Sequence, residues 1–294
     1  ALGLRAQSLQ AERRQHALEQ FVVEVRAAAQ LDEFDVVGNS IRAAERLGCL
    51  VLPMRQELGR HLGMSARANL RPVICVSRPS VEPTNHVPGD RQRFTVAHEL
   101  GHLALHSGLG PPTTAEEASR VEKQAHLFAG AFLAPGEAML DELAEHGGRV
   151  TLQTLASIKE RWGIAIKALV MRFQTLGVID SHHARSLHKQ ISARGWNKDE
   201  PVNVGNEEAI WLRKAVAKRV GSGSDVNAVA AAAAGIGRSY LDRWTDWTPT
   251  SPATDAESAK VVDLGQPSQK GSPSAEPHDA TVTDLAQHRS ARRR

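Results

Sequence analysis

The sequence has few cysteines, few aromatic residues and no long hydrophobic run. Two cysteines occur in 294 residues. Cys49 and Cys75 each lie in a short apolar run without Cys-x-x-Cys spacing, so we expect buried core thiols in a reducing compartment and no disulfide. No apolar stretch reaches the roughly 18–20 residues of a membrane helix, and no charged-then-apolar leader opens the chain. We therefore expect a cytoplasmic protein with no membrane partner.

A strong charge of one sign is also missing. The net charge is +3 and the isoelectric point is about 9.0, which allows nucleic-acid binding without requiring it. Hydrophobic residues make up 41% and charged residues 23%, as in ordinary globular proteins, whereas aromatic residues make up 4%. We therefore expect a core built mainly from Leu, Val, Ile and Ala.

The first part of the sequence has the periodicity of helices around a small sheet. Amphipathic helices are predicted at residues 8–29 and 36–47. Two short β-branched runs, at 49–54 and 71–78, are typical of strands. A loop rich in Pro, Asn and Gly is predicted at residues 78–92, and it leads into a helix.

The following part is predicted to be helical. Thr114 and Glu117 resemble a capping box that opens a helix over residues 115–133. From Thr151, two apolar-periodic helices separated at Gly163 look like a helix-turn-helix unit. Three further helices are predicted: a short one that begins after the segment APGE and ends at residue 146, one at 207–220 and one at 226–244.

The motif HELGH, residues 98–102, places two histidines four residues apart. On a helix, His98 and His102 share one face with Cβ atoms roughly 5–6 Å apart, so both imidazoles can bind one metal ion. Glu99 is rotated by about 100° from His98, which removes it from the ligand set but lets it reach a water on the metal as a base. The pattern predicts metal-assisted hydrolysis. The alternative is a buried helix whose histidines satisfy one another.

A catalytic zinc site needs a third protein ligand and an open position for water. The pattern with a third histidine six residues after His102 is excluded, because Gly108 stands there. His106 lies one turn further along the same face. We expect it to line the cleft or to support a ligand rather than to bind the metal.

The next helix offers the third ligand. Glu122 and His126 again lie four residues apart on one face, and a Glu on a packed neighbouring helix completes a site with two His and one Glu. Glu116 and Glu117 stay open as alternatives, although acidic residues are common in a first helical turn for dipole reasons alone. His126 can hydrogen-bond a ligand or a substrate carbonyl.

Two segments carry a resemblance to a known family. RQRFTVAHELGHLALH and, after a short gap, VEKQAHLFAGAFLAP resemble the ImmA/IrrE family of metallo-endopeptidases over roughly residues 35–145. The stretch TLASIKERWGIAIKALVMRFQTLGVI also looks like the helical segment that this family carries next.

The resemblance implies a zincin-like fold with zinc on His98, His102 and Glu122 and with Glu99 as general base. It also implies a role in prophages, mobile elements or stress responses, in which a partner transcriptional repressor is cleaved or inactivated. One departure from the family is His126, where the family usually has Asn.

The expected fold class is α+β. We predict a mostly helical zincin-like domain with a small sheet over residues 1–148, and a helical domain with the helix-turn-helix-like segment over 149–249. Residues 250–294 are rich in Ser, Pro, Asp and Ala. Because such a segment cannot bury enough apolar surface to offset its ordering entropy, we predict a disordered tail.

Two functions remain open at this point. The first is a zinc endopeptidase that cleaves a protein substrate, a helix-turn-helix repressor, with His106, His126 or Arg93 as unranked candidates to line the cleft and stabilise the oxyanion. The second is a regulator that acts without proteolysis, by binding the repressor or DNA. Direct DNA binding is not favoured, because the second helix of the 151–176 unit offers few polar contacts: Lys167, Arg172 and Gln174.

Overall fold

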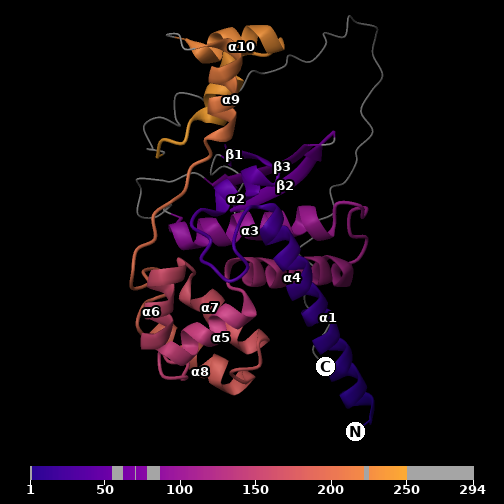
Figure 1. Cartoon of the computed structure of the whole chain (residues 1–294), viewed down its shortest axis with the longest axis vertical. Helices are drawn as coiled ribbons and strands as arrows, with labels where there is room; N and C mark the ends of the chain where they lie inside the picture. Colours follow the sequence, from indigo (N-terminus) through magenta and orange to yellow (C-terminus); the bar gives the residue numbers. More distant parts are fainter. Residues whose placement is uncertain (1, 55–61, 70, 78–86, 222–224, 250–294) are drawn as a thin grey trace, which may run out of the picture. The chain divides into compact units, whose positions relative to one another are not determined.

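The predicted α+β class is confirmed. The computed structural model describes residues 2–54, 62–69, 71–77, 87–221 and 225–249, and in this part of the chain a three-stranded sheet packs among helices (Figure 1). The described helices are α1 (Leu2–Ala28), α2 (Ser40–Arg46), α3 (Gly89–Leu105), α4 (Ala115–Leu133), α5 (Gly136–Glu145), α6 (Leu152–Trp162), α7 (Ile166–Thr175), α8 (Ser181–Ala193), α9 (Trp211–Val220), α10 (Val226–Ala234) and α11 (Arg238–Thr245). None of them is long and apolar enough to cross a membrane. The predicted tail, 250–294, lies outside the described residues.

The sheet has the order β1-β3-β2, with strands β1 (Leu50–Met54), β2 (Gly63–Ala68) and β3 (Arg71–Ser77). β3 is central, parallel to β1 and antiparallel to β2. β1 and β3 are the two predicted apolar runs, and their side chains enter the core. β2 was not predicted, because its sequence GMSARA lacks the apolar alternation of a strand. It forms through backbone pairing with β3.

Helix α3 contacts β2 and β3 on one side and α4 on the other (Figure 1). Gly101 allows α3 and α4 to approach closely. A Cβ at this position would lie 3.0 Å from Phe128 Cδ1 and 3.2 Å from the Ala125 carbonyl oxygen. Ala125 and Phe128 are fully buried beneath it. The glycine inside HELGH therefore sets the distance between the two helices that carry the predicted ligands.

The helix that carries HELGH begins at Gly89, within the residues predicted as a loop. The reason is a contact that the sequence does not display. Residues 203–210, which we call the strap, cross the first turn of α3. The Gly89 amide donates to the Val204 carbonyl at 3.1 Å. A Cβ on Gly89 would lie 2.1 Å from the Gly205 carbonyl oxygen, so only glycine fits under the strap.

The boundaries of α4 are those predicted, 115–133. Its capping box forms only in part. The Thr114 hydroxyl accepts from the Glu117 amide at 3.1 Å, but the Glu117 carboxylate accepts from the amide and hydroxyl of Thr113 instead of from the Thr114 amide.

Other predicted elements need adjustment. α2 begins at Ser40, capped by Asn39, and α9 begins at Trp211, so both are shorter than their patterns. The pattern over 226–244 breaks at Gly235, and α8 was not predicted. The two thiols are free as expected, but Cys75 is only partly buried.

The unit predicted as helix-turn-helix consists of α6 and α7, separated at Gly163 in the left-handed conformation. α7 buries its apolar face in the core. Arg172, one of its few polar residues, is also buried, where its guanidinium donates to the Ala134 carbonyl and to the Glu19 carboxylate. This arrangement favours a packing role for α7, and the division of the chain into domains stays a prediction.

Candidate metal centre

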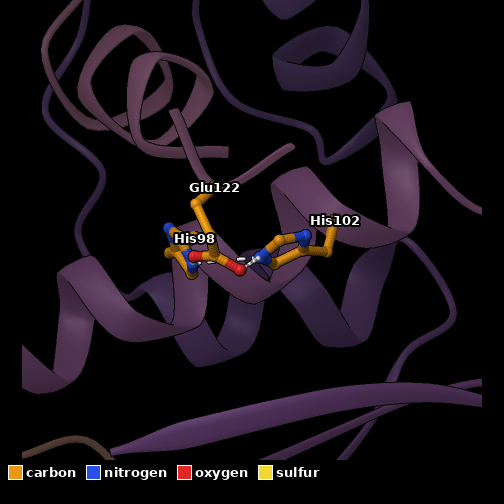
Figure 2. A group of neighbouring side chains, drawn as sticks. All are labelled: His98, His102 and Glu122. Carbon is orange, nitrogen blue, oxygen red and sulfur yellow. Dashed lines mark hydrogen bonds and ion pairs between the residues drawn. The ribbon is translucent and has the colours of Figure 1, made fainter. Parts of the chain in front are cut away.

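Two histidines of α3 and one glutamate of α4 meet where the helices pack. Figure 2 shows His98 and His102 beside Glu122. The two Nε2 atoms are 3.0 Å apart. The Glu122 carboxylate oxygens lie 3.2 Å from His98 Nε2 and 3.4 Å from His102 Nε2. Of the three predicted alternatives for the third ligand, Glu122 is the one that the structure brings to the histidines.

These spacings fit a zinc ion. Ligand atoms about 2.0–2.2 Å from a tetrahedral zinc lie about 3.3–3.6 Å from one another, close to the distances of this cluster. Two imidazoles and one carboxylate are also the donor set of catalytic zinc sites that keep a fourth position open. Glu116 and Glu117 do not belong to the cluster.

His102 is held by a relay that ends on α4. Its Nδ1 lies 3.3 Å from His106 Nδ1, and His106 Nε2 lies 3.0 Å from Gln124 Oε1. If His106 Nε2 donates to Gln124 and His102 Nδ1 donates to His106 Nδ1, then His102 Nε2 carries no proton. Its lone pair then faces Glu122 and is available to a metal ion. The structure thus places His106 beside His102, one of the two predicted histidine ligands. Gln124 was not singled out in the sequence.

Burial keeps His98 in the form that binds metals. Its pKa is lowered to about 4, by desolvation first and then by the neighbouring His126 and His102. Burial likewise lowers the pKa of His102. A neutral imidazole is the ligand form, so both rings are available to a cation at neutral pH. The His98 Nδ1 atom is buried and has no hydrogen-bond partner among the described residues, and the centroids of the His98 and His126 rings are 4.4 Å apart.

The metal-free protein should lose stability as the pH falls from about 6.5 toward 4. His98 binds a proton in the unfolded chain within this window but not in the folded chain, so protons favour unfolding there. Urea denaturation of the metal-free protein at several pH values measures this. His98→Gln should flatten the dependence, and the exposed His182→Gln is the matched control. Equal pH dependence of the two variants would contradict the assignment.

Glu99 lies beside the cluster and is 7% exposed. Its carboxylate oxygen Oε2 accepts a hydrogen bond from the Ser65 hydroxyl of β2 at 2.7 Å. Gly63, also on β2, lets the strand lie directly against α3. A Cβ there would lie 2.4 Å from Thr95 Cγ2 and 3.2 Å from Glu99 Cγ. The edge strand that was not predicted therefore orients the predicted general base.

A cleft of about 590 Å³ opens over the cluster. Its walls come from β2, from the second half of α3 with the residues that follow it, and from Glu122 of α4. His98, Glu99, His102 and His106 all line it. His126 does not line it; its Nδ1 donates to the Glu122 carbonyl at 2.9 Å.

Arg93 lies away from this cleft, unlike the expectation from the sequence. It is 6% exposed, and its guanidinium donates to the Glu207 carboxylate at 2.5 Å and to the carbonyls of Val37 and Gly38. The carboxylate of Glu207 also accepts from Ser40 Oγ at 2.7 Å and from the Ile41 amide at 2.9 Å. Arg93 thus joins α3 to α2 and the strap, because a buried guanidinium needs a paired charge.

Comparison with known proteins agrees with this geometry. Residues 44–174 match the family model of the IrrE N-terminal-like domain, which is a peptidase family. No curated protein matches the chain. The matched range contains HELGH, Glu122 and all three strands, so the function is of the metallopeptidase type. The match over residues 44–174 supports the resemblance of this part of the chain to the ImmA/IrrE family.

Proposed function

We propose that the protein is a zinc-dependent endopeptidase that cleaves a partner protein, a helix-turn-helix repressor, and so releases the genes that the repressor silences. The observation that carries the proposal is the meeting of His98, His102 and Glu122 in an open cleft with the carboxylate of Glu99 beside them. The identity of the partner rests on the family alone.

The residues divide the chemistry between them. Zinc, when bound by His98, His102 and Glu122, supplies a Lewis acid for the scissile carbonyl and lowers the pKa of water. Glu99 takes the proton of the attacking water and delivers it to the leaving amide nitrogen. The hydrogen bond from Ser65 holds this carboxylate in one orientation before the substrate arrives.

The wall of the cleft favours a polypeptide substrate. Ser65, Ala66 and Arg67 of β2 line the cleft, and β2 has β3 as its single strand neighbour in the described sheet. An extended peptide can pair with the outer edge of such a strand through backbone hydrogen bonds, which need no particular side chains. This binding mode would lay the peptide across the histidines.

His98→Ala and Glu122→Ala should each lose the zinc ion that the wild-type chain holds at one per molecule, because two remaining donors cannot complete the site. Metal analysis of the purified variants measures the occupancy. Glu116→Ala is the matched control, since it removes an exposed carboxylate from the first turn of the same helix. Full occupancy in both ligand variants would show that the zinc lies elsewhere.

Cleavage itself is tested by co-expression with a helix-turn-helix repressor encoded beside the gene, followed by mass spectrometry of the repressor. We expect one specific cut. Relief of repression with an intact repressor would instead favour inactivation by binding, the second candidate function.

A further inference from the structure

Helices α10 and α11 form a second two-helix unit, distinct from α6 and α7. α10 ends at Gly235, which has φ of 67°. The Gly235 amide donates to the Ala232 carbonyl at 3.2 Å, and the Ile236 amide donates to the Ala231 carbonyl at 3.0 Å. This pair of bonds is a Schellman motif, which ends a helix and turns the chain sharply. α11 begins three residues after Gly235.

The two helices contact each other and are joined by side-chain hydrogen bonds, while α10 also contacts α9 and α11 also contacts β1. Ala231 of α10 is 1% exposed and Leu241 of α11 is 6% exposed. Asn227 Nδ2 of α10 donates to Asp242 Oδ1 at 2.9 Å and to Thr245 Oγ1 at 3.1 Å on α11. The two hydrogen bonds of Asn227 therefore link α10 to α11 at two points.

We propose that residues 226–245 are a DNA-binding helix-turn-helix whose recognition helix is α11. A short turn with a left-handed glycine between two short helices is the architecture of this motif, in which the second helix enters the major groove. The first turns of the second helix contact the base edges.

The exposed side chains of α11 have the chemistry for this contact. Arg238, Ser239, Tyr240 and Arg243 are all exposed. Arg243 makes no ion pair within the described residues, which leaves its guanidinium available for a guanine edge. Arg238 is held by Asp225 at 2.8 Å and Asp242 at 3.2 Å, so it is oriented at the start of the helix.

Helix α9, which contacts α10, supplies cations for the phosphate backbone. Its exposed basic residues have no acidic partner among the residues that the structure describes: Arg213, Lys214, Lys218 and Arg219. Between residues 211 and 249 there are six basic and three acidic residues, although the whole chain is close to neutral. This local excess favours a polyanion over an uncharged protein surface.

The contrast with α7 strengthens the assignment. In α7 the arginine that would have to reach DNA, Arg172, is buried and paired with Glu19. In α11 the corresponding polar residues face outward, and the apolar Leu241 faces inward. The motif that was apparent in the sequence thus serves packing, whereas the pattern over 226–244, predicted only as helical, has an exposed polar face.

The test uses the full zinc-loaded chain and a library of random 20-base-pair duplexes. Repeated selection should enrich one sequence. Arg243→Ala should bind that sequence roughly ten- to a hundredfold more weakly and relax its preference at one position. Arg243→Lys keeps the charge but cannot form the bidentate hydrogen bonds of arginine to guanine. This variant should therefore retain binding to unselected DNA and lose the preference for the selected sequence. Lys218→Ala should weaken binding to all sequences alike and lower the salt slope by about 1.

Arg185→Ala is the matched control, because it removes an exposed arginine from α8 and should change nothing. Glu99→Gln should also leave DNA binding unchanged, which separates this proposal from the peptidase activity. The proposal is overturned if no sequence is enriched, if Arg243→Ala equals Arg185→Ala on the selected duplex, or if single-stranded RNA of the same length binds more tightly. It is also overturned if the Arg243 variants lose a protein partner while DNA binding persists.

Discussion

Replacing Glu99 by Gln should lower the rate of peptide-bond cleavage on the order of 10²–10⁴-fold. The amide has nearly the same shape, and its carbonyl oxygen can still accept the hydrogen bond from Ser65. It cannot take up a proton. Since Glu99 is not among the three ligand residues, the variant should keep zinc and fold and should still bind the repressor.

The variant is best measured by mass spectrometry of a co-expressed repressor, with zinc content and thermal unfolding as controls. Glu116→Gln, an exposed glutamate on α4, is the matched substitution and should cleave at the wild-type rate. Unchanged cleavage by Glu99→Gln would defeat the assignment of the general base. Loss of zinc from this variant would instead move Glu99 into the ligand set.

Glu207→Ala should destabilise the fold by about 3–5 kcal/mol, the cost of removing one partner from a buried ion pair. The substitution leaves the guanidinium of Arg93 buried without its carboxylate. It also leaves Ser40 Oγ and the Ile41 amide without their common acceptor. The strap should then release the first turn of α3, even though Glu207 lies outside the cleft.

Urea denaturation at neutral pH measures this loss. Glu208→Ala is the matched control, because the neighbouring glutamate is exposed and its removal should change stability by less than about 0.5 kcal/mol. The double variant Arg93→Leu with Glu207→Leu should recover much of the loss, because no buried charge is left unpaired. Equal stability of Glu207→Ala and Glu208→Ala would show that the pair contributes nothing.

Helical spacing was enough to bring His98 and His102 together and to offer Glu122 among the candidates for a third ligand. His98 and His102 lie four residues apart on α3, so the helical repeat puts them on one side, and Glu122 lies on the neighbouring helix α4. The limits of α4 followed from a capping threonine and from a proline after the last turn. Such local signals need no knowledge of the rest of the fold.

Contacts between distant segments could not be predicted in the same way. β2 exists because β3 supplies its hydrogen bonds, and its own residues carry no strand pattern. Arg93 was one of three unranked candidates to line the cleft, but its guanidinium pairs with the Glu207 carboxylate instead. Its partner Glu207 comes from a segment more than a hundred residues later. No local sequence pattern predicts that this segment packs against α3.

The close approach of β2 to α3 at Gly63 also determines the position of the cleft wall that β2 forms. An ordinary carbon contact needs at least about 3.4 Å, and a methyl group on Gly63 would stand 2.4 Å from Thr95 Cγ2. Thr95 cannot swing away freely, because its hydroxyl donates to the Arg91 carbonyl at 2.9 Å within the helix. Any larger residue would therefore have to shift the strand outward by roughly 1 Å, and the wall of the cleft that β2 forms would shift with it. The width of the cleft therefore depends on the absence of a Cβ atom at Gly63.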